Sequence, residues 1–132
     1  MNNKIDKVHM KYARSHEWIR LNGPHARVGV SARAQKELGE IVYVELPKVG
    51  QEVQAGSEVA ILESTKAAAD IYCPVSGKVT QINETLQQDI SLLNDFPESK
   101  GWLFELKVYN VSEIDQLLDQ VAYQALIEPS PG

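Results

Sequence analysis

The sequence has a single cysteine, Cys73, and no long hydrophobic run. One cysteine cannot form an intramolecular disulfide, which excludes the disulfide framework of a small secreted domain and suits a reducing compartment. No apolar run approaches the roughly 20 residues of a membrane-spanning helix. The first twelve residues have no apolar core of signal-peptide length. We therefore expect a cytoplasmic protein that makes no use of a membrane.

An excess of positive charge is also missing. Thirteen Lys and Arg stand against eighteen Asp and Glu, a formal net charge of −5, with the two signs interspersed. A protein that binds a phosphate backbone needs a clustered basic face, so we expect no nucleic-acid partner.

Metal-binding and catalytic patterns are absent as well. The histidines His9, His16 and His25 share no ligand spacing, and one cysteine cannot complete a zinc site from its neighbours. No phosphate loop or dinucleotide fingerprint occurs, and no nucleophile, base and orienting group can be assembled. We predict no metal and no intrinsic catalysis.

Short apolar runs separated by turn residues are the main pattern that the sequence does have. Such runs at intervals of about 8 to 12 residues indicate an all-β sandwich or barrel. The run at 41–46 is apolar at nearly every position, which predicts burial on both faces. The runs at 16–21 and 26–30 flank Asn22-Gly23-Pro24, which predicts a hairpin. In chain order the predicted strands are 16–21, 26–30, 41–46, one near Val53, 59–63, 70–75, 78–82 and 102–108.

Two segments carry helical signals. Ser31 can cap a short helix that ends at Gly39. Near the carboxyl end, Ser112 and Asp115 resemble a capping box. The spacing of the apolar residues there predicts an amphipathic helix at about 112–127, broken near Asp119 and packed on the barrel. Its predicted stripe consists of Ile114, Leu117, Leu118, Val121, Ala122, Ala125 and Leu126.

The 132 residues fit one domain. We place this domain at 11–128, after a flexible segment at 1–10 and before a frayed tail at 129–132.

The stretch LESTKAAAD at 62–70 places one lysine, Lys66, between two predicted strands. A type I turn at 64–67 would put this lysine at a hairpin tip, since that turn needs no glycine. Small residues on its carboxyl side leave room for a partner enzyme to reach the amine. On these grounds alone, an ordinary solvated turn lysine is the better interpretation of Lys66.

The run ESTKAAADIYCPVSGKV at 63–79 closely resembles the lipoyl-attachment hairpin of the glycine cleavage system H protein family. KYARSHEW at 11–18 and AQKELGEIVYVELPKVGQEVQAG at 34–56 resemble further segments of that family. So do GWLFELKV at 101–108 and SEIDQLLDQVAY at 112–123. The resemblance covers about residues 11–126, in order and at matching spacing.

This resemblance implies a mainly β fold, a barrel-sandwich hybrid with short peripheral helices and a carboxyl-terminal helix. It implies a monomeric carrier whose Lys66 bears lipoate through an amide bond, attached by a lipoyl or octanoyl transferase or ligase. The arm would take an aminomethyl group from the pyridoxal-phosphate glycine decarboxylase (P protein) and present it to the aminomethyltransferase (T protein). Dihydrolipoamide dehydrogenase (L protein) would then reoxidise the dithiol.

The resemblance also assigns roles to residues around Lys66. Ser15, Glu17 and Asp70 match contributors to a cleft for the loaded arm, and Leu38 matches its apolar wall. Glu63, three residues before the lysine, matches a recognition mark for the attaching enzymes. The three acids can alternatively be structural or plain surface charges.

This sequence departs from the family pattern at several positions. Thr65 stands where valine is usual, Ala69 where serine or threonine is, Glu98 where tyrosine is, and Glu37 where some members have a cleft histidine. The segment QQDIS lacks the usual proline.

Three alternative functions stay open from the sequence. The protein can relay lipoyl groups to 2-oxo-acid dehydrogenases or to another redox system, or it can be an unmodified β-barrel adaptor. A biotinyl carrier is disfavoured, because Thr65 and Ala67 replace the methionines that customarily flank a biotinylated lysine.

Overall fold

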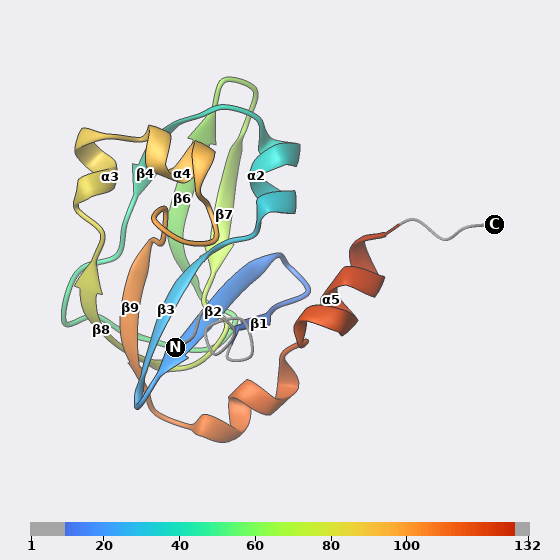
Figure 1. The fold of residues 1–132 in the computed structure, drawn as a ribbon. Helices are drawn as coiled ribbons and strands as arrows, with labels where there is room; N and C mark the ends of the chain where they lie inside the picture. The colour runs from blue at the N-terminus through green and yellow to red at the C-terminus, as the bar shows by residue number, and fades with distance from the viewer. Residues whose placement is uncertain (1–9, 129–132) are drawn as a thin grey trace, which may run out of the picture.

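The computed structural model describes residues 10–128 of the chain (Figure 1). The predicted tail at 129–132 lies outside the described residues, as does the predicted flexible segment except for Met10. Met10 begins the first strand and is buried.

The architecture is mainly β, as predicted, with every strand pair antiparallel. The strands are β1 (Met10–Tyr12), β2 (Glu17–Asn22), β3 (His25–Val30), β4 (Ile41–Glu45), β5 (Glu52–Val53), β6 (Glu58–Ser64), β7 (Ala68–Tyr72), β8 (Gly77–Ile82) and β9 (Phe104–Val108). The helices are α2 (Ala32–Leu38), α3 (Thr85–Gln88), α4 (Ser91–Asp95), the 3₁₀-helix η1 (Val111–Gln116) and α5 (Gln120–Ile127).

The strands form two sheets that share one core. One sheet has the order β1-β2-β3-β9-β8-β5 and the other the order β4-β6-β7. The main apolar cluster draws residues from both sheets, including Val28 of β3, Leu62 of β6 and Phe104 of β9. A smaller cluster consists of Met10, Tyr12, Trp18 and Tyr123 and joins β1 and β2 to α5. Burial of these apolar faces between the sheets is the main stabilising contribution to the fold.

The predicted hairpin at 16–30 is confirmed. Asn22 pairs with His25, so Gly23 and Pro24 alone form the loop between β2 and β3. Gly23 has φ +63°, a left-handed conformation that glycine adopts without a steric penalty.

The prediction that the strand at 41–46 is buried on both faces is wrong. Ile41 and Val44 of β4 are buried, whereas Val42 and Tyr43 are each 51% exposed. The pairing of β4 with β6 shifts register between Ile41 and Tyr43. Since the three-stranded sheet packs on the core with one face only, the apolar residues of the other face remain in solvent.

The helix predicted from Ser31 to Gly39 is confirmed as α2. Ser31 Oγ accepts a hydrogen bond from Ala34 N at 3.1 Å, and Gly39 N donates to Gln35 O at 2.9 Å. Two very short helices, α3 and α4, were not predicted. Four or five residues are too few to show a helical period in the sequence.

The carboxyl-terminal prediction is right about a helix packed on the barrel and about the break near Asp119, but wrong about the first cap and the continuous stripe. Asn110, not Ser112, caps the first part, which is the 3₁₀-helix η1. Asp119 Oδ1 accepts from Ala122 N at 2.8 Å and starts a separate helix, α5. The single predicted stripe does not form, because Val121 is 79% exposed and Tyr123 is the buried residue of α5.

Within residues 10–128, no helix has both the length and the apolar character needed to cross a membrane.

Candidate functional site: the β6–β7 hairpin and the adjacent cavity

Lys66 is exposed at the tip of the hairpin formed by β6 and β7. The last ladder pair is Glu63 with Ala68, and Ser64 N donates to Ala67 O at 2.8 Å. Ser64 Oγ accepts from the backbone N–H groups of Lys66 and Ala67, each at 3.0 Å. The serine side chain therefore fixes the tip backbone, while the lysine side chain stays accessible.

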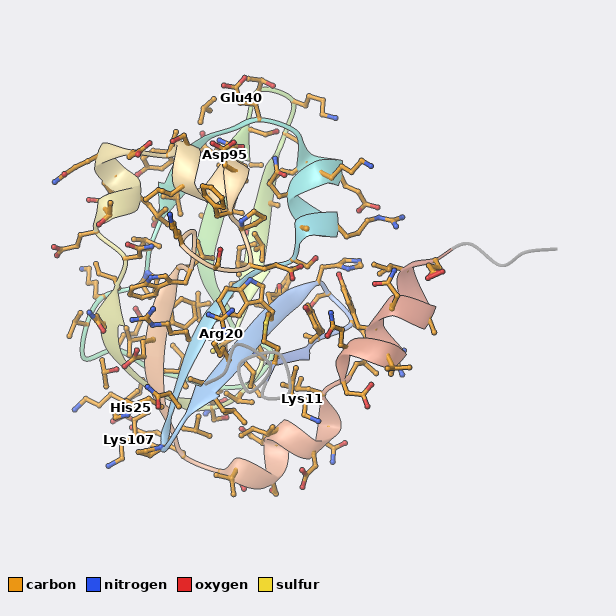
Figure 2. The ribbon with its side chains drawn as sticks, viewed as in Figure 1. Lys11, Arg20, His25, Glu40, Asp95 and Lys107 are labelled. Atoms are coloured by element: carbon orange, nitrogen blue, oxygen red, sulfur yellow. The ribbon has the colours of Figure 1, made fainter. Side chains whose placement is uncertain are left out.

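The hairpin tip is also joined to the end of α2. Thr65 N donates to Glu40 O at 3.1 Å. Gly39 has φ +90°, and a Cβ placed on it would lie 3.1 Å from Lys66 Cε. The stem of Lys66 therefore lies close over the Gly39 backbone, where a side chain would be strained and crowded. Figure 2 shows Glu40 at this end of the molecule, with His25 and Lys107 at the other end.

A cavity of about 240 Å³ lies between β2, α2 and β7. All four residues that the resemblance assigns to the arm cleft, which are Ser15, Glu17, Leu38 and Asp70, line it. The other lining residues are Val30, Ala34, Glu37, Leu62, Ala69 and Ile71. The structure thus brings together residues that lie up to 56 positions apart in the sequence, from Ser15 to Ile71.

Glu17 is the buried acid of this cavity, with 2% of its surface exposed. Ser15 Oγ donates to Glu17 Oε1, and Tyr72 N donates to Glu17 Oε2 at 3.0 Å. Burial raises the pKa of the Glu17 carboxyl, and the two hydrogen bonds act in the opposite direction. The carboxylate is oriented by two donors, and among residues 10–128 no cation forms an ion pair with it.

Two further carboxylates border the cavity and are exposed. Asp70 lies on β7, opposite Ile61 of β6. Glu37 lies on α2 and forms an ion pair with Arg33, with Nε and Oε2 2.6 Å apart. The hydrogen bond from Arg33 lowers the pKa of the Glu37 carboxyl. Three acids at one apolar-walled cavity favour an occupant that is apolar along its length and cationic at one end.

Glu63, the predicted recognition residue, lies outside this cavity. It is exposed on β6, between Tyr43 of β4 and Ala68 of β7. Sequence reasoning did not identify Ser64 and Gly39 as parts of the site. The signal for Ser64 was present, because serine at the start of a turn often accepts backbone hydrogen bonds.

The remaining candidates for a reactive or metal-binding group do not form a second site in the part of the chain that the structure describes. Cys73 is 1% exposed, and burial raises the pKa of its thiol to about 12. A buried thiol of this kind is a poor nucleophile. The part of the chain that the structure describes holds no cluster of three His, Cys, Asp or Glu side chains suited to a metal ion.

The fold and the hairpin are those of a carrier domain of the lipoyl type: two antiparallel sheets around one core, with an accessible lysine at a tight turn. Comparison with known proteins specifies the class further. The chain belongs to the glycine cleavage H-protein family, since the model of that family matches residues 10–130. Members of this family are lipoyl carriers of the glycine cleavage system.

Individual relatives agree. The chain is 47% identical over 114 residues to the glycine cleavage system H protein of Thermotoga maritima, covering 86% of this chain and 92% of that protein. It is 48% identical over 119 residues to the H protein of Alcanivorax borkumensis, covering 90% and 93%. The crystal structure of an H protein from Mycobacterium marinum superposes with a TM-score of 0.81 at 31% identity, covering 89% of this chain and 95% of that one.

Proposed function

We propose that this protein carries lipoate in amide linkage to Lys66 Nζ and moves the aminomethyl group of glycine between enzymes. Its donor is the pyridoxal-phosphate glycine decarboxylase and its acceptor is the aminomethyltransferase. Dihydrolipoamide dehydrogenase then receives the dithiol. The observation that carries the proposal is the exposed Lys66, held on a fixed hairpin tip at one end of the cavity walls.

The residues around Lys66 fit this group. When bound, lipoate supplies a disulfide that accepts the aminomethyl group and two electrons. Ala67, Ala68 and Ala69 place no bulk beside the lysine, so an attaching enzyme can enclose the tip. Glu63, exposed on the adjoining strand, is the charge that this enzyme recognises.

The cavity accommodates the arm between transfers. Leu38, Leu62 and Ile71 give it an apolar wall that suits a hydrocarbon chain. Glu17 and Asp70 stabilise the protonated amine of the cargo, and Ser15 keeps the Glu17 carboxylate in place. The protein excludes water from the cargo and brings it to each enzyme at a high effective concentration. It makes and breaks no bond itself.

The proposal also covers the location, the oligomeric state and the partners of the protein. We place the protein in the cytoplasm as a monomer, without metal, membrane or nucleic-acid partners. Its partners are the three glycine cleavage enzymes and a lipoyl or octanoyl transferase or ligase.

A reconstituted glycine cleavage assay tests the function. The wild-type protein, lipoylated beforehand, is mixed with the three partner enzymes, and the release of carbon dioxide from glycine is followed. Lys66→Arg keeps the positive charge but cannot form the amide, so we expect the rate to fall to that measured without the protein. Lys78→Arg, an exposed lysine on β8, is the matched control and should keep full activity.

Two results would count against the proposal. Turnover with Lys66→Arg would contradict the attachment site. A lipoylated wild-type protein that the decarboxylase ignores, but that donates lipoyl groups to a 2-oxo-acid dehydrogenase, would favour the relay function instead.

A further inference from the structure

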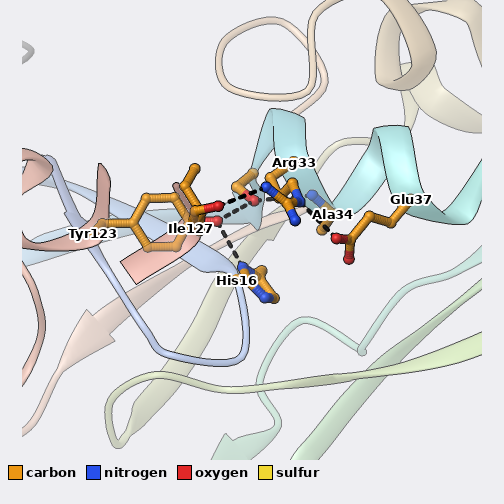
Figure 3. A network of polar contacts seen from close by, with 7 residues as sticks. His16, Arg33, Ala34, Glu37, Tyr123 and Ile127 are labelled. Carbon is orange, nitrogen blue, oxygen red and sulfur yellow. Dashed lines mark hydrogen bonds and ion pairs between the residues drawn. The ribbon is translucent and has the colours of Figure 1, made fainter. Parts of the chain in front are cut away.

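One hydroxyl group on α5 contacts two residues that adjoin two walls of the cavity. Tyr123 Oη donates to Ser31 Oγ at 2.7 Å and lies 2.7 Å from His16 Nδ1 (Figure 3). Ser31 caps α2, which contributes Ala34, Glu37 and Leu38 to the cavity. His16 lies between Ser15 and Glu17, which line the cavity from β2 and the turn before it. Tyr123 itself does not line the cavity.

The surroundings of this hydroxyl hold it in place. Tyr123 is 4% exposed and Ser31 is fully buried. The Tyr123 ring stacks on Tyr12 with centroids 4.3 Å apart. Burial raises the pKa of the Tyr123 hydroxyl, so it remains a neutral donor. When it donates to Ser31, His16 has to donate from Nδ1, and the residues that adjoin both walls are then bonded to one oxygen.

His16 has an unusual backbone conformation. Its φ is +79°, and it is the only residue other than glycine with a positive φ among residues 10–128. This conformation is disfavoured for a residue with a Cβ. It persists where surrounding contacts impose it, and here these are the side-chain contact with Tyr123 and the hydrogen bond from Ser31 N to His16 O at 2.8 Å.

A second contact joins the end of α5 to the cavity rim. Arg33 Nη1 donates to Ile127 O at 2.9 Å, while Arg33 Nε donates to Glu37 (Figure 3).

Glu98, which replaces the usual tyrosine of the family pattern, adds contacts between β1 and the start of α2. Its carboxylate accepts from Tyr12 Oη at 3.1 Å and from Ala32 N, in the first turn of α2, at 2.8 Å.

We infer that α5 is a clamp that sets the spacing between α2 and the His16 turn, and that Tyr123 is its positioning residue for the arm cavity. The inference rests on the proposed function, because the clamp matters to the carrier only if the arm uses the cavity. Tyr123 touches no cargo. It acts through Ser31 and His16, and it determines how well the cavity keeps water from the loaded arm.

Tyr123→Phe tests the clamp, because it keeps the ring that stacks on Tyr12 and removes only the hydroxyl. Tyr109→Phe is the matched control, since Tyr109 follows β9, does not line the cavity and is 53% exposed. The first readout is amide hydrogen exchange of the unmodified protein. For Tyr123→Phe we expect exchange to rise about three- to tenfold at Ser31 N and in α2, with no change in β8 and β9.

The second readout is the lifetime of the cargo. Lipoylated protein is loaded with glycine by the decarboxylase, separated from it, and the spontaneous release of ammonia is measured. Tyr123→Phe should release ammonia about three- to tenfold faster than the wild type and Tyr109→Phe. The rate at which a ligase lipoylates Lys66 should not change, because the hairpin tip is untouched.

A second variant distinguishes the loss of this contact from a general loss of stability in Tyr123→Phe. His16→Gly removes the side-chain contact and tolerates the positive φ, so it should reproduce the faster release. Combined with Tyr123→Phe it should add little, since Tyr123→Phe has already removed the contact with His16.

If the wild-type protein keeps its cargo longer than free loaded dihydrolipoamide does, ammonia release by Tyr123→Phe at the wild-type rate would overturn the inference, whatever the exchange data show. If the wild-type protein keeps its cargo no longer than free loaded dihydrolipoamide does, the sheltering role of the cavity is refuted. Hydrogen exchange alone then decides whether the clamp exists.

Discussion

Glu17 carries an ionisable carboxyl group in a buried position, where the charged form is disfavoured. Its carboxyl is almost wholly buried, yet it accepts hydrogen bonds from Ser15 Oγ and Tyr72 N. Burial disfavours the charged form and outweighs these hydrogen bonds, so the pKa of Glu17 is raised. A carboxylate held in this way is prepared to receive a cation, since a protonated amine would compensate the cost of burying the charge.

The raised pKa of Glu17 predicts a specific pH dependence of stability. A group whose pKa is higher in the folded state stabilises the fold below its unfolded pKa, here about 4.3, and this contribution is lost as the pH rises through the folded pKa. Glu17→Gln does not titrate, and its amide can still donate to Ser15 and accept from Tyr72 N.

We therefore expect the free energy of unfolding of the wild type, relative to Glu17→Gln, to decrease from pH 4 towards pH 7. Urea unfolding of both proteins across this range measures the difference. A difference that stays constant with pH would show that the folded-state pKa of Glu17 is not raised.

At the scale of elements, the β6–β7 hairpin depends on the side chain of Ser64. Its oxygen takes the place of a backbone acceptor for the N–H groups of Lys66 and Ala67. The type I turn predicted from the sequence correctly placed Lys66 at the tip but did not anticipate this serine contact, which a backbone turn type does not specify.

Ser64→Ala should therefore loosen the tip without unfolding the protein. We expect a loss of about 0.5–1.5 kcal/mol in the free energy of unfolding, because the freed N–H groups are exposed and can bond to water. Hydrogen exchange at residues 65–67 should speed up, and ligase-catalysed lipoylation should slow. Ser64→Thr keeps the hydroxyl and should behave like the wild type. Equal tip exchange in all three proteins would rule out the role of Ser64.

The carboxyl-terminal elements show where periodicity misleads. The apolar spacing at 112–127 suggested one stripe, which requires one continuous helix. Asn110 and Asp119 each cap a helix, so η1 and α5 have separate axes, and their apolar residues do not share a face. The break at Asp119 was predictable, because aspartate is a good N-cap, but the 3₁₀ geometry of η1 was not.

At the scale of the whole molecule, the mainly β architecture was predictable because turn residues punctuate short apolar runs. The order of strands in the two sheets was not, since β3 pairs with β9 across more than 70 residues. The convergence of Ser15, Glu17, Leu38 and Asp70 on one cavity likewise depends on tertiary packing. Only the family resemblance suggested it, and spacing alone would not have done so.

The same packing explains why the strand at 41–46 is not buried on both faces, as the sequence had suggested. A run such as IVYV at 41–44 looks fully buried, but a two-sheet protein covers each sheet on one face. Val42 and Tyr43 are consequently exposed on the sheet that carries the lysine hairpin.

The mass of the intact protein, made in a host or reaction that attaches lipoate, tests the central claim most directly. We predict a gain of one lipoyl or octanoyl group, mapped by peptide sequencing to Lys66, and no gain in Lys66→Arg. An unmodified wild-type product, or a group attached to a different lysine, would contradict the account.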